Sequence, residues 1–231
     1  MRFGLIVPSS NTTMEDEFWR MACGLATVQT TRMRLQKIII DKLEQMEQQM
    51  LEAAVRLADA EVDVIGYGCT SGSFFKGKDH AKEIERKITQ KTRISAVATA
   101  KAVIEALHEL QIRRVCVAAP YTEEINKLEK KFLEQNGIEV LRIKGLSIVR
   151  NAEVGRKDPS EVYELAKEVY LPQTQGIFIS CTSFRTTEVI EHLEKKLGML
   201  VISSNTATFW AMMRKAGVKR RLEGYGRLLL R

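Results

Sequence analysis

The sequence predicts an α/β protein with two pseudo-symmetric lobes, each a mainly parallel sheet flanked by helices. Short β-branched runs alternate with longer segments of helical period, which is typical of parallel strands joined by crossover helices. Two landmarks also recur at one spacing, because Pro8 and Pro120, like Cys69 and Cys181, are 112 residues apart. This spacing far exceeds the roughly 20–50 residues of solenoid repeats. It therefore indicates a duplicated unit, with lobes at 1–111 and 112–231.

In the first lobe, β-branched and apolar runs predict strands at 3–7, 27–34, 62–67 and 93–96. Segments of helical period predict helices at 12–23, 41–60, 78–90 and 97–110. The clearest pattern is 41–60, where apolar residues recur at steps of three and four with Glu and Gln between them. Residues 70–78 hold two glycines and no period, so we expect an irregular, mobile segment there.

The second lobe repeats this order. Strands are predicted at 114–119, 138–144, 176–180 and 199–203, and helices at 121–136, 159–171, 184–197 and 205–216. No low-complexity linker separates the halves. We therefore expect the lobes to pack closely, with the last helix able to pack on the first lobe.

Composition excludes several classes of function. No stretch approaches the roughly 18 apolar residues of a membrane span, and the chain enters a strand at once without a leader, so we expect a cytoplasmic protein. In that compartment its four cysteines are thiols, and we expect Cys23 and Cys116 to be buried as small hydrophobes. The net charge is +7, but Lys and Arg alternate with Glu along predicted helices. Such interleaving is typical of solvated faces and not of a nucleic-acid site.

Small hydroxyl and amide residues gather in the loops that follow strands, and three of the five Asn lie there. In parallel sheets these loops converge at one edge, where ligands bind and helix N-termini expose N–H groups. Any one of these loops can also be read as a helix cap. The six loops are Pro8-Ser9-Ser10-Asn11-Thr12, Gly68-Cys69-Thr70-Ser71-Gly72, Pro120-Tyr121-Thr122, Arg150-Asn151-Ala152, Ser180-Cys181-Thr182-Ser183 and Ser203-Ser204-Asn205-Thr206.

Cys69 and Cys181 occupy matched positions, each at a strand end and followed by Thr-Ser and then a predicted helix. Because N–H groups and the helix dipole lower a thiol pKa there, we expect reactive thiolates. The three histidines lie on predicted helices, which argues against a metal cluster and a Cys-His hydrolase, and no glycine-rich nucleotide loop follows a strand. A cofactor-free thiol pair acting on a small anion remains. Four residues would hold its carboxylates and stabilise an enediolate: Thr70, Ser71, Thr182 and Ser183.

Taken together, these loops resemble the aspartate/glutamate racemase superfamily, and within it the maleate cis–trans isomerase branch, with arylmalonate decarboxylase as a near relative. The resemblance runs over residues 1–217. It implies a cofactor-independent enzyme with its active site between the lobes, and relatives suggest a homodimer. In decarboxylases of this branch a glycine stands where this chain has Cys69, so Cys69 favours an isomerase or racemase.

For an isomerase, the resemblance implies a role for each site residue. Cys69 would add to the double bond of maleate, giving a succinyl thioether that can rotate about the new single bond. Cys181 would exchange the proton at the neighbouring carbon, and elimination of Cys69 would release fumarate. Asn11, Tyr121 and Asn151 would hydrogen-bond to the substrate carboxylates.

Three alternatives stay open. In an amino-acid or hydantoin racemase, the two cysteines would act on one carbon from opposite faces, and an acidic partner would receive the ammonium group. Only Glu123 and Glu153 lie near the loops, which favours an all-carboxylate substrate. A decarboxylase-like enzyme and a redox protein with a reversible disulfide are also considered, although the Cys-x-x-Cys spacing is absent.

Overall fold

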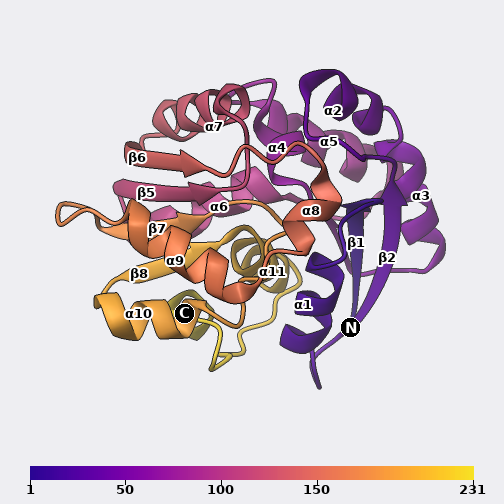
Figure 1. The fold of residues 1–231 in the computed structure, drawn as a ribbon. Coiled ribbons are helices and arrows are strands. Elements are labelled where there is room, and N and C mark those ends of the chain that lie inside the picture. The colour runs from indigo at the N-terminus through magenta and orange to yellow at the C-terminus, as the bar shows by residue number, and fades with distance from the viewer.

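The computed structural model describes residues 1–231 and contains two four-stranded parallel sheets, one from each half of the chain (Figure 1). The first sheet has the order β2-β1-β3-β4, and the second has the order β6-β5-β7-β8. The predicted fold class is confirmed. The strands are β1 (Arg2–Pro8), β2 (Thr27–Met33), β3 (Val64–Tyr67), β4 (Ala96–Ala98), β5 (Arg114–Ala119), β6 (Glu139–Gly145), β7 (Gly176–Ile179) and β8 (Leu200–Ser203).

The internal repeat extends to three strands of each sheet. β1, β2 and β3 begin 112 residues before β5, β6 and β7, respectively. β4 and β8 depart from this register, since they begin 104 residues apart. Two helices stand between the third and fourth strands of the first sheet, whereas one helix stands there in the second.

The helices flank both sheets and cover their faces (Figure 1). They are α1 (Met14–Met21), α2 (Ile40–Glu47), α3 (Met50–Asp59), α4 (Thr70–Phe74), α5 (His80–Thr92), α6 (Thr99–Glu109), α7 (Glu123–Gln135), α8 (Asn151–Gly155), α9 (Pro159–Val169), α10 (Ile190–Leu197), α11 (Ser204–Lys215) and the 3₁₀ helix η1 (Arg227–Leu230). The short helices α4 and α8 and the turn η1 were not predicted. All three are too short to show a helical period.

Two predicted helices are wrong in extent. The predicted helix 41–60 is divided into α2 and α3 at 48–49, where Gln49 Oε1 accepts the N–H of Arg34 at 2.9 Å. The predicted helix 184–197 begins only at Ile190, because the N–H groups of Thr186 and Thr187 donate to a carboxylate of the other lobe. In both places a contact distant in sequence competes with the local pattern.

The segment predicted as irregular, 70–78, begins with α4, and all five residues of that helix are buried. Its sequence, Thr-Ser-Gly-Ser-Phe, has little helix propensity, so packing stabilises it. α4 packs against α2, α5, α6 and α7.

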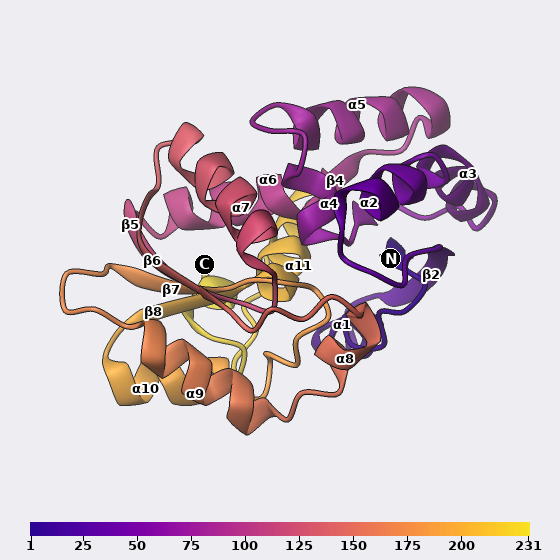
Figure 2. The ribbon, with the colours of Figure 1, turned by 45° about the horizontal axis from the view of Figure 1, so that its top comes forward.

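α11 lies between the two sheets, as Figure 2 shows, and packs on α6, β3 and β4 of the first half and β8 of the second. Its residues from Ser204 to Met213 are all buried. Phe209 meets the rings of Phe3 and Phe18 edge-on, with centroids 5.7 and 5.2 Å apart. A helix buried on every side joins the two halves into one core.

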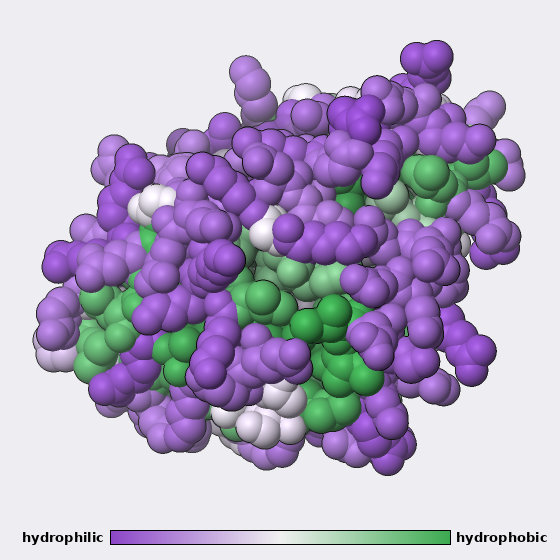
Figure 3. All heavy atoms as spheres, turned by 90° about the horizontal axis from the view of Figure 1, so that it is seen from above, coloured by the Kyte–Doolittle hydropathy of each residue, from purple (hydrophilic) through white to green (hydrophobic).

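The surface is mostly hydrophilic, with apolar side chains gathered in limited patches (Figure 3). The large exposed apolar side chains are those of Met1, Trp19, Leu51 and Leu230. No helix of the chain combines the length and the apolar character needed to cross a bilayer.

Candidate active site

Cys69 lies just after β3 and is the N-cap residue of α4. Its Sγ accepts the N–H of Gly72 at 3.3 Å and lies 3.8 Å from Ser71 Oγ. A Cβ on Gly72 would come within 2.9 Å of this sulfur, so the close approach of the helix requires glycine. The thiol therefore lies at a helix N-terminus, although this helix is α4 and not the helix predicted at 78–90.

Cys181 follows β7 and has a backbone φ of +94°, in a region that non-glycine residues rarely adopt. Neighbouring groups hold this conformation. Its N–H donates to Ser204 Oγ at 3.1 Å, and its Sγ accepts the N–H of Ser183 at 3.4 Å. Backbone strain that contacts impose in this way is typical of functional sites.

The two cysteine loops meet across the boundary between the lobes. Thr182 Oγ1 donates to the carbonyl of Gly68 at 3.1 Å, and Thr70 Oγ1 donates to Ser204 Oγ at 2.9 Å. Since Ser204 Oγ also accepts the N–H of Cys181, one hydroxyl joins the residues next to both thiols. A charge on Cys69 raises the pKa of Cys181, as expected for sulfurs that share one site.

Both sulfurs are shielded from solvent, and this decides their protonation. Cys69 is 3% exposed and Cys181 is 5% exposed. Burial raises the pKa of Cys69 to about 11 and that of Cys181 to about 12, although N–H donors at each sulfur oppose the shift. The prediction of lowered thiol pKa values is therefore wrong for this closed site. Desolvation outweighs the helix N-terminus at Cys69, and no helix begins at Cys181, since α10 starts only at Ile190. Both groups are neutral thiols at pH 7.

Asn11 and Asn151 are buried and hydrogen-bond across the lobes. Asn11 caps the first turn of α1 through Oδ1 and donates from Nδ2 to Thr182 Oγ1 at 3.0 Å. Asn151 accepts from Ser183 Oγ at 3.0 Å and donates from Nδ2 to Ser10 Oγ at 2.9 Å. Because an amide nitrogen carries two hydrogens, each Asn keeps one N–H for an anion.

Two buried tyrosines have hydroxyl groups without a hydrogen-bond partner. Burial raises the pKa of both hydroxyls well above the usual range, and a charge on Cys181 or on Cys69 would raise that of Tyr121 or Tyr67, respectively, further. An unsatisfied buried hydroxyl costs about 1–3 kcal/mol, which a ligand oxygen would recover. Tyr67 was not predicted, although it ends the strand that leads to Cys69.

The remaining loop residues divide into two groups. Thr70 and Thr182 use their hydroxyls to join the lobes, whereas Ser71 and Ser183 lie at the two sulfurs. Ser203 caps α11, as expected for that loop. Of the two other cysteines, Cys116 is buried as predicted, but Cys23 is exposed beyond the end of α1, so that prediction is wrong.

The family profile described as arylmalonate decarboxylase matches residues 3–229. The chain belongs to the arylmalonate decarboxylase family. This confirms the resemblance inferred from the loops. The chain is also 29% identical to the maleate isomerase of Pseudomonas putida KT2440, over 99% of this chain and 96% of that protein.

Two solved structures share the fold of this family member. One is a maleate isomerase variant from Pseudomonas putida S16 with maleate, which has a TM-score of 0.96 and 28% identity and covers 100% of this chain and 97% of its own. The other is a Nocardia farcinica maleate cis–trans isomerase variant with a cysteine replaced by serine and a covalently bound succinylcysteine intermediate. It has a TM-score of 0.96 and 25% identity, and the match covers 99% of this chain and 97% of that chain.

In this family member, a buried carboxylate that the sequence analysis missed joins the lobes. Glu17 of α1 accepts hydrogen bonds from five donor groups of the second half, namely the N–H and Oγ1 groups of Thr186 and Thr187 and Nδ2 of Asn205. The same Nδ2 also donates to the carbonyl of Thr182, next to Cys181. The available signal was a glutamate on the apolar face of a helix, between Met14 and Phe18.

We expect Glu17→Ala to destabilise the protein by about 3 kcal/mol or more, because several buried donors lose their acceptor and each costs about 1–3 kcal/mol. For a chain of this size, the midpoint of thermal unfolding should fall by roughly 6–12 °C. Differential scanning calorimetry measures this. Glu15→Ala is the control, since Glu15 lies on the same helix and is partly exposed. An equal midpoint for both variants would contradict the assigned role of Glu17.

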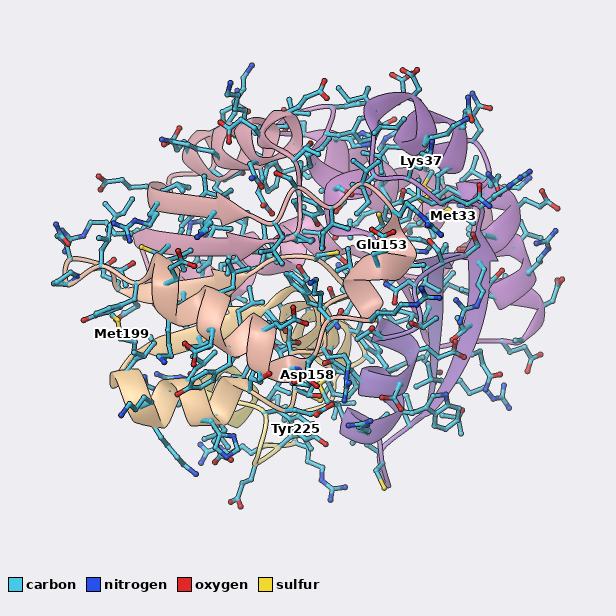
Figure 4. All side chains as sticks on the ribbon, in the orientation of Figure 1. Met33, Lys37, Glu153, Asp158, Met199 and Tyr225 are labelled. Atoms are coloured by element: carbon cyan, nitrogen blue, oxygen red, sulfur yellow. The ribbon has the colours of Figure 1, made fainter.

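A short backbone bridge also holds the lobes together. The N–H of Ile38 donates to the carbonyl of Val149 at 2.8 Å, and the N–H of Asn151 donates to the carbonyl of Gln36 at 3.0 Å. Figure 4 labels Lys37 on one side of this bridge and Glu153 of α8 on the other. With the bonds between the cysteine loops, this bridge holds the lobes closed over the two buried thiols.

Proposed function

We propose that the protein is a maleate cis–trans isomerase, which converts maleate or a related small cis-diacid to fumarate through a succinyl-cysteine intermediate. The observation that carries this proposal is that the two matched loops, each with a buried cysteine, are hydrogen-bonded to one another between the lobes. Similar proteins named maleate isomerase, and a solved relative with a succinylcysteine, support it.

The reaction needs one nucleophile and one proton carrier. Cys69 first loses its proton to solvent as maleate enters the site, because burial otherwise keeps it a neutral thiol. The resulting thiolate adds to one olefinic carbon, and the electron pair of the double bond moves toward the carboxylate of the neighbouring carbon as an enediolate. Cys181 donates a proton to that carbon, and the new single bond rotates. Cys181 then removes the proton, the C–S bond breaks, and Cys69 leaves. No electron is gained or lost overall, so two thiols suffice.

Neutral donors bind the substrate in this proposal. The free N–H groups of Asn11 and Asn151 and the unpartnered hydroxyl of Tyr121 hydrogen-bond to the two carboxylates. The two asparagines are already fixed by their other hydrogen bonds, so they can stabilise the enediolate without reorganisation. The four further residues proposed to complete this anion site are Thr70, Ser71, Thr182 and Ser183.

The site offers no acidic partner for the ammonium group of an amino-acid substrate. Of the acidic residues near the loops, Glu123 and Glu153 lie on the surface, where they pair with Lys127 and Arg150, respectively. They are therefore not available to an ammonium group inside the site. All four cysteines are free thiols, so no disulfide joins Cys69 to Cys181.

Proton NMR tests the proposed function directly. The protein is incubated with maleate in deuterated buffer, and the vinyl signal of maleate should be replaced by that of fumarate. Incubation with aspartate, glutamate or a hydantoin in the same buffer should leave the α-proton signal unchanged. Loss of an α-proton signal with no fumarate formed would instead identify a racemase.

We expect Tyr121→Phe to lower kcat by about 10²-fold or more, since one oxyanion donor in a buried site contributes on this scale. The ring and its edge contact with Phe74, at 6.2 Å between centroids, are retained in this variant. Steady-state kinetics with maleate measure the effect. Tyr225→Phe is the matched control, because Tyr225 is partly exposed and lies near the C-terminus. Unchanged kcat in the Tyr121 variant would remove the hydroxyl from the mechanism.

A further inference from the structure

Glu129 of α7 lies directly behind the Cys181 loop. Its carboxyl is 1% exposed, and Oε1 accepts a hydrogen bond from Ser180 Oγ at 2.5 Å. Ser180 is the residue that precedes Cys181, so this bond fixes the end of the strand that carries the thiol. The other oxygen, Oε2, has no partner.

The surroundings of Glu129 favour a neutral carboxyl. The side chain borders a small apolar space walled by Phe74, Phe132 and Phe178, which has no room for a water molecule. No cationic side chain pairs with it. Burial also raises the pKa of Glu17, but five donor groups oppose that shift, whereas Glu129 has one donor.

Because Glu129 has a single hydrogen-bond donor, its ionised form is poorly stabilised. An ionised carboxylate in an apolar site costs more than a neutral one unless donors or cations compensate it. Burial accordingly raises the pKa of Glu129 to about 8, and the single bond from Ser180 opposes the shift only in part. Glu129 is neutral at pH 7 and gains its charge in the mildly alkaline range.

A negative charge on Glu129 would act on Tyr121 in the active site. Burial raises the pKa of Tyr121 well above its usual range, and negative charges on Cys181, Glu129 and Cys69 raise it further. These are the titratable groups that face Glu129. From α4 and α6 it meets only uncharged side chains, Thr70, Phe74, Ala100 and Val103, and the same is true of the aromatic walls from α7 and β7.

We propose that Glu129 is a positioning residue that works in its neutral form. It holds Ser180, and so the strand end with Cys181, while it keeps the rear of the active site uncharged. Ionisation of Glu129 would place a negative charge behind Tyr121, where it opposes both the Cys181 thiolate and the enediolate. The catalytic part of this inference rests on the proposed isomerase function.

The test compares the wild-type protein with Glu129→Gln, whose amide is neutral at every pH and whose carbonyl can accept from Ser180. At pH 6.5 the two proteins should have similar kcat for maleate. Because about nine-tenths of Glu129 would be ionised one pH unit above its pKa, the ratio of wild-type to variant kcat should fall roughly tenfold between pH 7 and 9. Parallel pH profiles would overturn the proposal.

Two further variants separate charge from structure. Glu129→Ala removes the acceptor of Ser180, so kcat should fall even at pH 6.5, while Glu129→Gln keeps it. Ser180→Ala removes the one bond that favours the ionised form, so the alkaline loss of activity should move to higher pH. Full kcat of Glu129→Ala at pH 6.5 would contradict the positioning role of Glu129. So would a Ser180→Ala protein that loses activity at the same alkaline pH as the wild type.

A readout without maleate distinguishes this inference from the proposed function. Iodoacetamide alkylates thiolates, and peptide mass spectrometry reports the rate at Cys181. At pH 9 that rate should be higher in Glu129→Gln than in wild type, because the variant lacks the opposing charge. This result in a protein that does not isomerise maleate would leave the Glu129 inference standing and remove the function. Equal alkylation rates in a protein that isomerises maleate would remove the Glu129 inference and leave the proposed function standing.

Discussion

Replacing Cys69 with serine is expected to lower kcat for maleate by at least about 10³-fold, which corresponds to roughly 4 kcal/mol of transition-state free energy. Serine keeps a hydrogen-bond acceptor for the N–H of Gly72 and is a good N-cap for α4. The fold should therefore survive while the nucleophile is lost, because a neutral hydroxyl is a poor nucleophile without an adjacent base.

The control for this experiment is Cys23→Ser, the same substitution at the exposed thiol beyond α1. That variant should retain wild-type kcat. Thermal unfolding of both variants, followed by circular dichroism, confirms that they are folded. A Cys69→Ser protein that is folded and turns over maleate at the wild-type rate would exclude Cys69 as the nucleophile.

Replacing Cys181 with serine is expected to trap the intermediate. The enediolate is basic enough to take its proton from the serine hydroxyl or from water, so the adduct can still form. Elimination requires a base that removes this proton from the carbon next to the thioether, and serine is a poor base, so the adduct should persist. Fumarate formation should fall by about 10²–10⁴-fold, the contribution typical of a positioned acid or base. After incubation with maleate, intact-protein mass spectrometry should show one added maleate for each chain.

Peptide mapping then locates the adduct, which should lie on Cys69. The variant with both cysteines replaced by serine is the control and should acquire no mass. A solved relative with a cysteine replaced by serine carries such a succinylcysteine. Rapid turnover without any adduct, or an adduct on another cysteine, would contradict the roles assigned to the two thiols.

Local patterns in the sequence were sufficient for most of the architecture. All eight strands were predicted within about three residues of their bounds. Six of them are buried apolar runs bounded by polar loops, whereas the edge strands β2 and β6 are β-branched but partly exposed. The matched spacing of Pro8 and Pro120 and of Cys69 and Cys181 revealed the duplication, and the structure extends it to three strands of each sheet. The loops after these strands contain the residues that meet between the lobes.

Helix boundaries were less accessible, because contacts distant in sequence determine them. Nothing near Gln49 indicates that its side chain bonds to Arg34 and divides the helix. Nothing near Thr186 indicates that its N–H donates to Glu17 instead of a helical carbonyl. Propensity is a weak preference that one buried hydrogen bond can outweigh.

The sequence alone determined the two-lobed α/β fold, its internal repeat and the matched cysteines, because these features are written in local periodicity and spacing. Only the tertiary structure decided the electrostatics of the site. A helix N-terminus lowers the pKa of a thiol, but burial raises the pKa by a larger amount. The extent of burial depends on how the lobes close. For the same reason Glu17 and Glu129 became visible only in the folded molecule, where one carboxyl meets five donors and the other meets one.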